Sequence, residues 1–300
     1  MLTDATLLFE HLDQLCRTPR PAMSGELETA RQYVENQLIA AGWNCERQPF
    51  EAQNSMLESL NGINIVARHP ALQSAASDQK NFPTLVVGAH LDSREETPGA
   101  DDNASAVVTL LEIARVIPQL IADQKLACDL ELVAFDLEEN GMLGGAWHAA
   151  IARQTNRNLA GMISLEMLGY CDPKPGSQKL PEPLIGLYPD TGDFIAIIGN
   201  QVSTSLISNW RQGMEQVEGL PIQSLQVPNN GNDLQASRLS DHSPFWDEGF
   251  AALMITDTSF LRNPYYHLAT DTPETLDRDF LHKVAEGSTL AISHILKSGL

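Results

Sequence analysis

The feature that most constrains the fold is an alternation of short apolar runs with longer segments of helical spacing. Residues 61–67 (NGINIVA), 83–89 (PTLVVGA) and 130–135 (LELVAF) have the length and composition of strands, and residues 162–168 and 251–255 continue the series. Strands that alternate with helices indicate a sheet whose neighbouring strands are mostly parallel. We therefore predict the α/β class, as a three-layer α/β/α sandwich with a mixed, mainly parallel central sheet.

Helices are expected where apolar residues recur every three or four positions. Residues 24–42 show this pattern, with Ser24 as a candidate N-cap and Gly42 as a candidate stop. The other expected helices lie at residues 1–17, 104–117, 143–153, 192–210 and 275–297, with a short one from Ser240 or Asp241 through residue 247. Residues 70–81 and 226–239 are expected to be loops. Without an internal repeat or a linker, residues 1–300 are predicted to form one domain.

The charge balance excludes several classes of partner. The chain has 19 Lys and Arg against 39 Asp and Glu, a formal net charge of -20. Nucleic acids and anionic membranes both require basic patches, so neither is expected to bind. A negative site suits divalent metal ions and a substrate with a free ammonium group. No apolar run reaches the roughly 20 residues that span a bilayer.

The N-terminus and the cysteines indicate the cellular compartment of the protein. Residues 1–17 lack a basic start followed by an apolar block, so no secretory signal is expected unless one was removed before residue 1. Cys16, Cys45, Cys128 and Cys171 form no C-x-x-C pair. These observations favour free thiols in the cytoplasm. A Cys16–Cys45 disulfide is the alternative for an exported protein.

Two polar clusters are candidate metal ligands, one directly after the predicted strand at 83–89 and one in the loop that follows it, because ligands of α/β proteins bind beyond the carboxyl ends of strands. His90-Leu91-Asp92 directly follows the run at 83–89. A neutral imidazole binds zinc, and a nearby carboxylate can fix its tautomer. Residues 98–105 (PGADDNAS) place an acidic pair where a helix begins. Helix capping is the common role of such residues, but a carboxylate can instead bridge two metals.

Two further groups of acidic residues are associated with the next two predicted strands, one directly after a strand and one inside a strand. Residues 136–141 (DLEENG) come after the run at 130–135 and contain Glu138 and Glu139. One of two adjacent carboxylates can bind metal while the other takes a proton from water, although a solvated acidic loop is the simpler alternative. Glu166 lies inside an apolar strand, where an unpaired carboxylate is costly to bury. Either a salt bridge or a metal ion would compensate that cost.

The last candidate cluster is Tyr265-Tyr266-His267, followed by Asp271-Thr272-Pro273. A loop histidine often has no special role, so this motif alone is weak. We expect that description to fit the histidines outside the motifs, namely His11, His69, His148, His282 and His294.

Together, these segments resemble the zinc aminopeptidases of the bacterial leucyl-aminopeptidase type, which belong to the di-zinc exopeptidases together with glutaminyl cyclases. The matching segments are GAHLDS, PGADDNAS, AFDLEENGMLGG, SLEMLGY, SDHSPFW and NPYYHLATDTPETLD, between about residues 84 and 277. The resemblance implies a zinc-dependent hydrolase with two Zn²⁺ per chain. Its substrate would be a peptide with a free N-terminus, from which it removes N-terminal residues.

The resemblance also implies a role for each matching residue. The implied metal ligands are, in chain order, His90, Asp101, Glu139, Glu166 and His267. Asp101 would bridge both metals, with His90 and Glu166 completing one site and Glu139 and His267 the other. Catalysis would depend on two more residues, Glu138 as the general base and Asp92 as the group that orients the first histidine. Two zinc ions about 3.5–4 Å apart would share the attacking water.

Three details go beyond this ligand set. Many family members have aspartate where this chain has Glu166, whose longer arm can change metal spacing and affinity. His242, in the Ser240-Asp241-His242 segment, is the rival of His267, which we prefer because it carries the family's Tyr-His pattern. The resemblance also predicts a cis peptide bond between Asp101 and Asp102, which would turn the first carboxylate toward both metals.

Three other functions stay open from the sequence. A glutaminyl cyclase has a similar ligand set but generally one zinc. A carboxypeptidase or dipeptidase needs basic residues for a substrate carboxylate, and Arg238, Arg262 and Lys174 are the candidates near the motifs. A non-catalytic metal- or peptide-binding relative is the third, and the intact Glu138–Glu139 pair argues against it.

Overall fold

The centre of the molecule is an eight-stranded sheet with the strand order β1-β2-β4-β3-β5-β10-β8-β9. It is seen in a computed structural model that describes residues 1–73, 82–122 and 124–300. The strands span β1 Asn44–Gln53, β2 Ser59–Arg68, β3 Thr84–His90, β4 Asp129–Phe135, β5 Leu159–Glu166, β8 Ile195–Asn200, β9 Ile222–Val227 and β10 Ala252–Thr256. A second, two-stranded sheet pairs β6 Asp172–Pro175 with β7 Thr191–Gly192.

The sheet is mixed and mainly parallel, as predicted. The pairs β3–β4, β3–β5, β5–β10 and β8–β9 are parallel. The pairs β1–β2, β2–β4 and β8–β10 are antiparallel. The four central strands β4, β3, β5 and β10 therefore all end at the same edge of the sheet.

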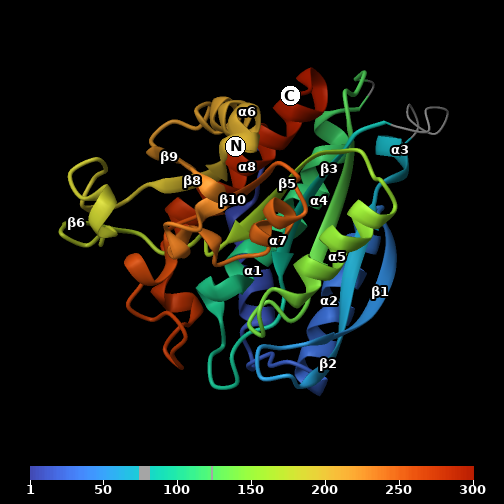
Figure 1. The fold of residues 1–300 in the computed structure, drawn as a ribbon, viewed down its shortest axis with the longest axis horizontal. Helices are drawn as coiled ribbons and strands as arrows, with labels where there is room; N and C mark the ends of the chain where they lie inside the picture. The colour runs from blue at the N-terminus through green and yellow to red at the C-terminus, as the bar shows by residue number, and fades with distance from the viewer. Residues whose placement is uncertain (74–81, 123) are drawn as a thin grey trace.

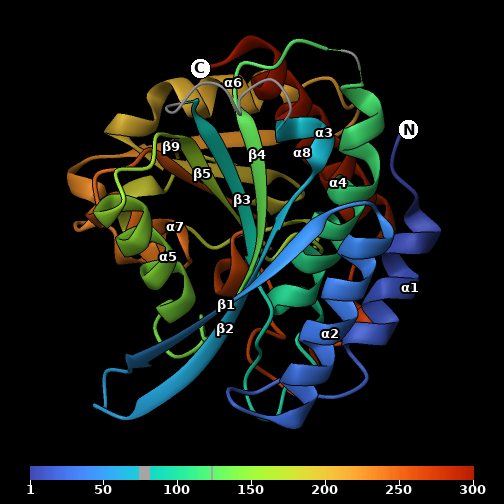
Figure 2. The ribbon, with the colours of Figure 1, turned by 90° about the vertical axis from the view of Figure 1, so that its right-hand side faces the viewer.

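Helices cover both faces of this sheet, which confirms the three-layer prediction (Figures 1 and 2). One face is covered by α1, α2, α4, α6 and α8, and the other by α5 and α7. The helices span α1 Ala5–Leu15, α2 Gly25–Ala40, α3 Pro70–Gln73, α4 Ala106–Leu120, α5 Leu143–Gln154, α6 Thr204–Met214, α7 His242–Asp247 and α8 Arg278–Ser298.

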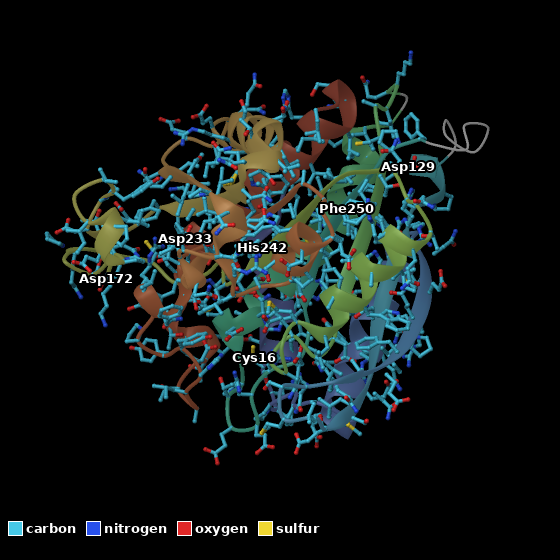
Figure 3. The ribbon with its side chains drawn as sticks, in the orientation of Figure 1. Cys16, Asp129, Asp172, Asp233, His242 and Phe250 are labelled. Atoms are coloured by element: carbon cyan, nitrogen blue, oxygen red, sulfur yellow. The ribbon has the colours of Figure 1, made fainter. Side chains whose placement is uncertain are left out.

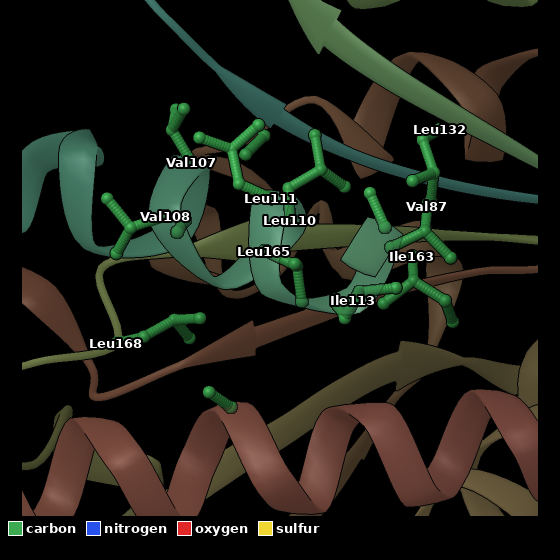
Figure 4. Packing of buried hydrophobic residues seen from close by; sticks show 14 of the residues in the cluster. Val87, Val107, Val108, Leu110, Leu111, Ile113, Leu132, Ile163, Leu165 and Leu168 are labelled. Carbon is green, nitrogen blue, oxygen red and sulfur yellow. The ribbon is translucent and has the colours of Figure 1, made fainter. Parts of the chain in front are cut away.

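The two hydrophobic cores follow from the alternation of side chains along each strand. In β3, Val87 packs in the core beneath α4, whereas the preceding Val86 belongs to the core beneath α5 and α7. Figure 4 shows Leu110 and Ile113 of α4 beside Val87 and Ile163, within the same core. Because α4 begins right after the PGADDNAS segment, this packing fixes that segment against the sheet.

Most predicted elements are confirmed, one is corrected, and strands such as β1 and β9 were not predicted. Residues 192–210 were expected to be helical, but they form β8 followed by α6. Their apolar stretch pairs with β10 and β9 in the sheet, and a short apolar run does not by itself distinguish helix from strand. The strand β1 was not predicted because it is an edge strand with mostly polar, exposed residues.

Three smaller expectations also have an outcome. Residues 70–73 form α3, and the rest of the predicted 70–81 loop lies outside the described residues. All four cysteines are free, so the alternative Cys16–Cys45 disulfide does not form. In residues 1–73, 82–122 and 124–300, no helix is long and apolar enough to cross a membrane.

Candidate functional site

The candidate residues meet at the shared edge where the central strands end. His90 is the last residue of β3 and Glu166 the last residue of β5. His90 lies opposite Phe135, the end of β4, and the loop that follows carries Glu138 and Glu139. Parallel pairing brings these ends to one edge, as expected for a ligand site in an α/β protein.

The carboxylate of Asp102 lies between two histidines. Its Oδ1 is 3.2 Å from Nε2 of His90, and its Oδ2 is 3.1 Å from Nε2 of His267. The Asp102 side chain is only 4% exposed. One carboxylate therefore presents a different oxygen to each imidazole.

A further carboxylate stands beside each histidine. Oε2 of Glu166 is 3.6 Å from His90 Nε2, and Oε2 of Glu139 is 3.3 Å from His267 Nε2. Two groups of candidate ligand atoms result, His90 with Asp102 and Glu166, and Asp102 with Glu139 and His267, each within 4.8 Å. Glu138 belongs to neither group.

The structure places Asp102, rather than the expected Asp101, between the two histidines. The expected bridge Asp101 points away from the histidines, where its Oδ1 accepts from the Gly169 N–H and its Oδ2 from Asn263 Nδ2, at 2.9 and 2.7 Å. The cis peptide bond is likewise between Asp102 and Asn103 rather than between Asp101 and Asp102. Asp101 and Asp102 both donate their backbone N–H to the carboxylate of Asp271, which orients the turn.

The segment that carries Asp102 is tied to the end of β5 by side chains. Asn103, Ser105 and Asp101 each accept a hydrogen bond from one backbone N–H of residues 167–169, all at 2.9 Å. Nδ2 of Asn103 also donates to the carbonyl of Leu165. These bonds set Asp102 and the neighbouring Glu166 in a fixed mutual position.

Asp92 links the first histidine to the loop after β4. Its backbone carbonyl lies 3.1 Å from Nδ1 of His90, closer than its carboxylate oxygen at 3.5 Å. The carboxylate instead accepts the backbone N–H groups of Glu138 and Glu139, both at 3.1 Å. The geometry therefore fits the expected orienting role of Asp92, but through the main chain.

Two orphaned polar atoms show that the site suits a metal ion. Within the described part of the chain, His90 Nε2 and Glu139 Oε1 are buried without a hydrogen-bond partner. Such atoms are rare in folded proteins because losing water without compensation is costly. Imidazole nitrogens and carboxylate oxygens are common zinc ligands. The residues present therefore fit zinc or a similar divalent ion.

Protonation of the site reflects crowded carboxylates around two imidazoles. Burial, together with nearby Glu166, raises the pKa of Glu138 well above its usual range, although His90 opposes this. Hydrogen bonds to Asp102 and Glu139 raise the pKa of His267 to about 9, against the opposing effect of burial. The same two histidines hold the pKa of Asp102 below its usual range despite its burial. The site without metal is thus a dense cluster of mutually dependent charges.

His242 does not face either group of candidate ligands. Its Nε2 donates to the Ser237 carbonyl at 2.8 Å, and its ring packs edge-on against Trp246. Burial lowers its pKa to about 3, so it is neutral. Figure 3 labels it in the middle of the fold. His267 is therefore the histidine that meets Asp102.

Three neighbours of the site were not singled out by the sequence. Nε of Arg94 is 2.8 Å from Glu139 Oε2, and Oγ of Ser240 donates to Glu166 Oε2 at 2.7 Å. The ring of Tyr266 stacks on the ring of His267. Arg94 directly follows the segment GAHLDS, and Tyr266 lies beside His267 in the last cluster, but no spacing in the sequence indicated either contact. Ser240, in the segment SDHSPFW, was considered only as a helix cap.

An apolar pocket of about 250 Å³ opens beside the candidate ligands. Its floor consists of alternate residues from one face of β8 and β10, including Ala196, Ile198 and Met254. Residues 180–188, in the segment around β6 that projects from the body in Figure 1, supply Leu184 and other wall residues. Asp102, Glu138, Glu139, Glu166 and His267 line its polar end.

Comparison with known proteins gives two kinds of match. In sequence, the chain is 37% identical to the uncharacterized protein YfbL of Escherichia coli over 219 residues, 68% of this chain and 65% of that protein. It is 29% identical to leucine aminopeptidase 1 of Trichophyton equinum over 256 residues, 81% of this chain and 63% of that protein. The chain thus spans less than two thirds of the length of these relatives.

Solved structures share the fold at low identity. A zinc aminopeptidase from Bacillus subtilis superposes with a TM-score of 0.74 and 14% identity, covering 99% of this chain and 97% of that one. A glutaminyl cyclase from Porphyromonas gingivalis does so with a TM-score of 0.72 and 18% identity, covering 97% and 98%. At such identities the likeness concerns the fold alone.

The family itself is shown by a broader match. The family model of peptidase family M28 matches residues 64–292, well over half of the chain. This range contains every candidate site residue, and the resemblance seen in the sequence motifs is confirmed. The chain is therefore a member of peptidase family M28.

Proposed function

We propose that this chain is a two-zinc aminopeptidase. The observation that carries the proposal is the Asp102 carboxylate, which offers one oxygen to the side of each histidine. In this assignment His90 and Glu166 would hold one zinc, Glu139 and His267 would hold the other, and Asp102 would contribute a ligand to both sites. When bound, the two ions would supply Lewis acidity, which lowers the pKa of a shared water and polarises the scissile carbonyl.

Glu138 is the proposed general base. It stands outside both ligand groups, yet its Oε2 is within 3.9 Å of His90 Nε2, and its backbone is fixed by Asp92. Burial and neighbouring carboxylates raise its pKa, which strengthens it as a proton acceptor. It would take a proton from the attacking water and then return that proton to the leaving amine.

The shape and charge of the pocket support action on the first residue of a peptide. The pocket is mostly apolar and meets the carboxylates Glu138, Glu139 and Glu166 at one end. A first residue with an apolar side chain would fill the pocket, while its free ammonium group would lie at the acidic end. We therefore expect leucine-, methionine- or phenylalanine-like residues to be removed fastest.

The three basic residues considered for a carboxypeptidase are not placed to bind the C-terminal carboxylate of a substrate. Arg262 is buried, with its Nε bound to Gln178 and its guanidinium over the Phe194 ring. Arg238 is paired with Asp247 at 2.7 Å, and exposed Lys174 does not line the pocket. These engagements favour recognition of an N-terminus over that of a C-terminus.

Metal analysis combined with a substrate panel tests the proposal. Purified protein should bind two zinc ions and hydrolyse leucyl anilide, with activity lost in a chelator and restored by zinc. N-acetyl-leucyl anilide should be inert, because it lacks the free amine. One metal ion together with pyroglutamate formation from a glutaminyl peptide would instead establish a cyclase. Bound metal without turnover of any peptide would indicate a binding protein.

A further inference from the structure

Arg94 is the cation at the mouth of the acidic site. Among the described residues that line the pocket, it is the one arginine, and there is no lysine. Its side chain is 52% exposed, whereas Glu139, to which it is paired, is only 7% exposed. Arg94 therefore lies between the buried carboxylates and solvent.

The position of Arg94 is fixed by its neighbours in the segment that joins His90 to Asp102. Next to it, Ser93 donates its N–H to the Arg20 carbonyl and accepts the Arg20 N–H at its Oγ. The guanidinium of Arg20 is buried and donates to four main-chain carbonyls, those of Leu15, Leu91, Pro98 and Gly99. Such bonds preorganise the segment before any substrate arrives.

The guanidinium of Arg94 has unused binding capacity. Its Nε is 2.8 Å from Glu139 Oε2, and no other ion pair or hydrogen bond of its side chain occurs within residues 1–73, 82–122 and 124–300. Its two terminal nitrogens are thus free to donate. A planar guanidinium presents a fork that matches a carboxylate, so an anion is the partner that these nitrogens suit best.

We propose that Arg94 binds a carboxylate on the leaving part of the substrate, an inference that rests on the proposed aminopeptidase function. The first side chain enters the apolar pocket, so the rest of the peptide must leave toward solvent, past the half-exposed guanidinium. A substrate carboxylate there would otherwise be repelled by Glu138 and Glu139. It can be the C-terminal carboxylate of a dipeptide or an acidic side chain at the second residue.

The competing role of Arg94 is to hold Glu139 in place. In that case its replacement would slow all substrates equally. The ratio of kcat/KM for two substrates, measured on the same variant, is independent of this common effect. It is equally independent of any fraction of the protein that is unfolded or lacks metal. Zinc content of each variant should be measured alongside the ratio.

Two substrate pairs differ only in the carboxylate. The first is Leu-Ala against Leu-Ala amide, and the second is Leu-Asp amide against Leu-Asn amide. We expect wild-type kcat/KM to favour the acid about tenfold in at least one pair, because a charge-assisted bond here is partly exposed. The first pair reports a terminal carboxylate and the second a side chain. The preference should decrease in high salt.

Variants complete the test. In the substrate pair that shows the preference, Arg94→Gln should bring the acid-to-amide ratio of kcat/KM close to one. Arg94→Lys should keep part of the preference. Lys174→Gln removes a charge from the exposed segment around β6 and should leave the ratio unchanged. Wild-type ratios of one in both pairs would overturn the inference, as would an unchanged ratio in Arg94→Gln. Hydrolysis of none of the four peptides by zinc-loaded wild type would overturn the proposed function itself.

Discussion

The carboxylates of Asp101 and Asp102 are adjacent in the chain but point to opposite sides of one short segment. Asp101 binds the backbone N–H of Gly169 and the amide of Asn263, whereas Asp102 faces His90 and His267. The first residue thus holds the scaffold together, and the second is available to metal. This difference separates two residues that look alike in the sequence.

Replacing each of these residues by asparagine should therefore have different effects on metal content. Asp102→Asn removes the charge that the two proposed zinc ions share, so the purified variant should retain fewer than two zinc ions. Asp101→Asn keeps an oxygen for the Gly169 N–H and should retain both ions, with a lower melting temperature because a buried contact changes. Elemental analysis and thermal unfolding measure these outcomes. Full zinc content in Asp102→Asn would refute the bridge.

Glu138→Gln should separate catalysis from metal binding. The amide keeps the shape of the side chain but cannot accept the proton, so kcat on leucyl anilide should fall by roughly 10²–10⁴-fold. Zinc content should stay nearly unchanged. Glu139→Gln is the matched comparison, because this variant should contain less zinc than wild type. Near-normal turnover in Glu138→Gln would mean that another group is the base.

Narrowing the pocket should change the preferred first residue. Ala196 lines the floor of the pocket, and Ala196→Leu fills part of that space. We expect kcat/KM for leucyl anilide to fall about tenfold relative to alanyl anilide, since a misfit of a few methylene groups has effects of this size. Ala52→Leu, on β1 and outside the pocket, should leave the ratio unchanged. An unaltered ratio in Ala196→Leu would place the first side chain elsewhere.

Metal-free protein should become more stable as the pH falls from 9 to 7. Interactions in the folded state raise the pKa of His267 to about 9, and burial raises that of Asp241 to about 8 and that of Asp271 to about 7. Groups with a raised pKa bind more protons in the folded state than in the unfolded state, so unfolding becomes harder as pH decreases through this window. His242, with a lowered pKa of about 3, changes stability only below about pH 6.5.

Thermal unfolding in a chelator measures this trend. The melting temperature should rise from pH 9 to pH 7, and zinc should weaken the dependence because bound cations keep the carboxylates ionised and the histidines neutral. A melting temperature that falls from pH 9 to pH 7 in the chelator would contradict the charge arrangement at the site.

The limits of sequence reasoning about the fold are visible in two segments. The strands β3, β4 and β5 were predictable because they are buried on both sides and therefore nearly continuous runs of apolar residues. The strand β1 was not, because its polar residues form a strand only by pairing with β2. Likewise, the apolar residues of β8 form a strand because β10 and β9 lie on either side of it.

At the site, the sequence alone determined which motifs meet, because residues that follow parallel strands must lie at one edge of the sheet. His90, Glu139 and Glu166 lie at or just after strand ends of this kind, whereas His267 lies in a later loop, and the family resemblance implied all four as ligands. Only the tertiary structure decided between Asp101 and Asp102, because adjacent side chains share the same motif and differ only in direction. That direction is set by hydrogen bonds to distant residues such as Asp271, and local sequence patterns do not contain such contacts.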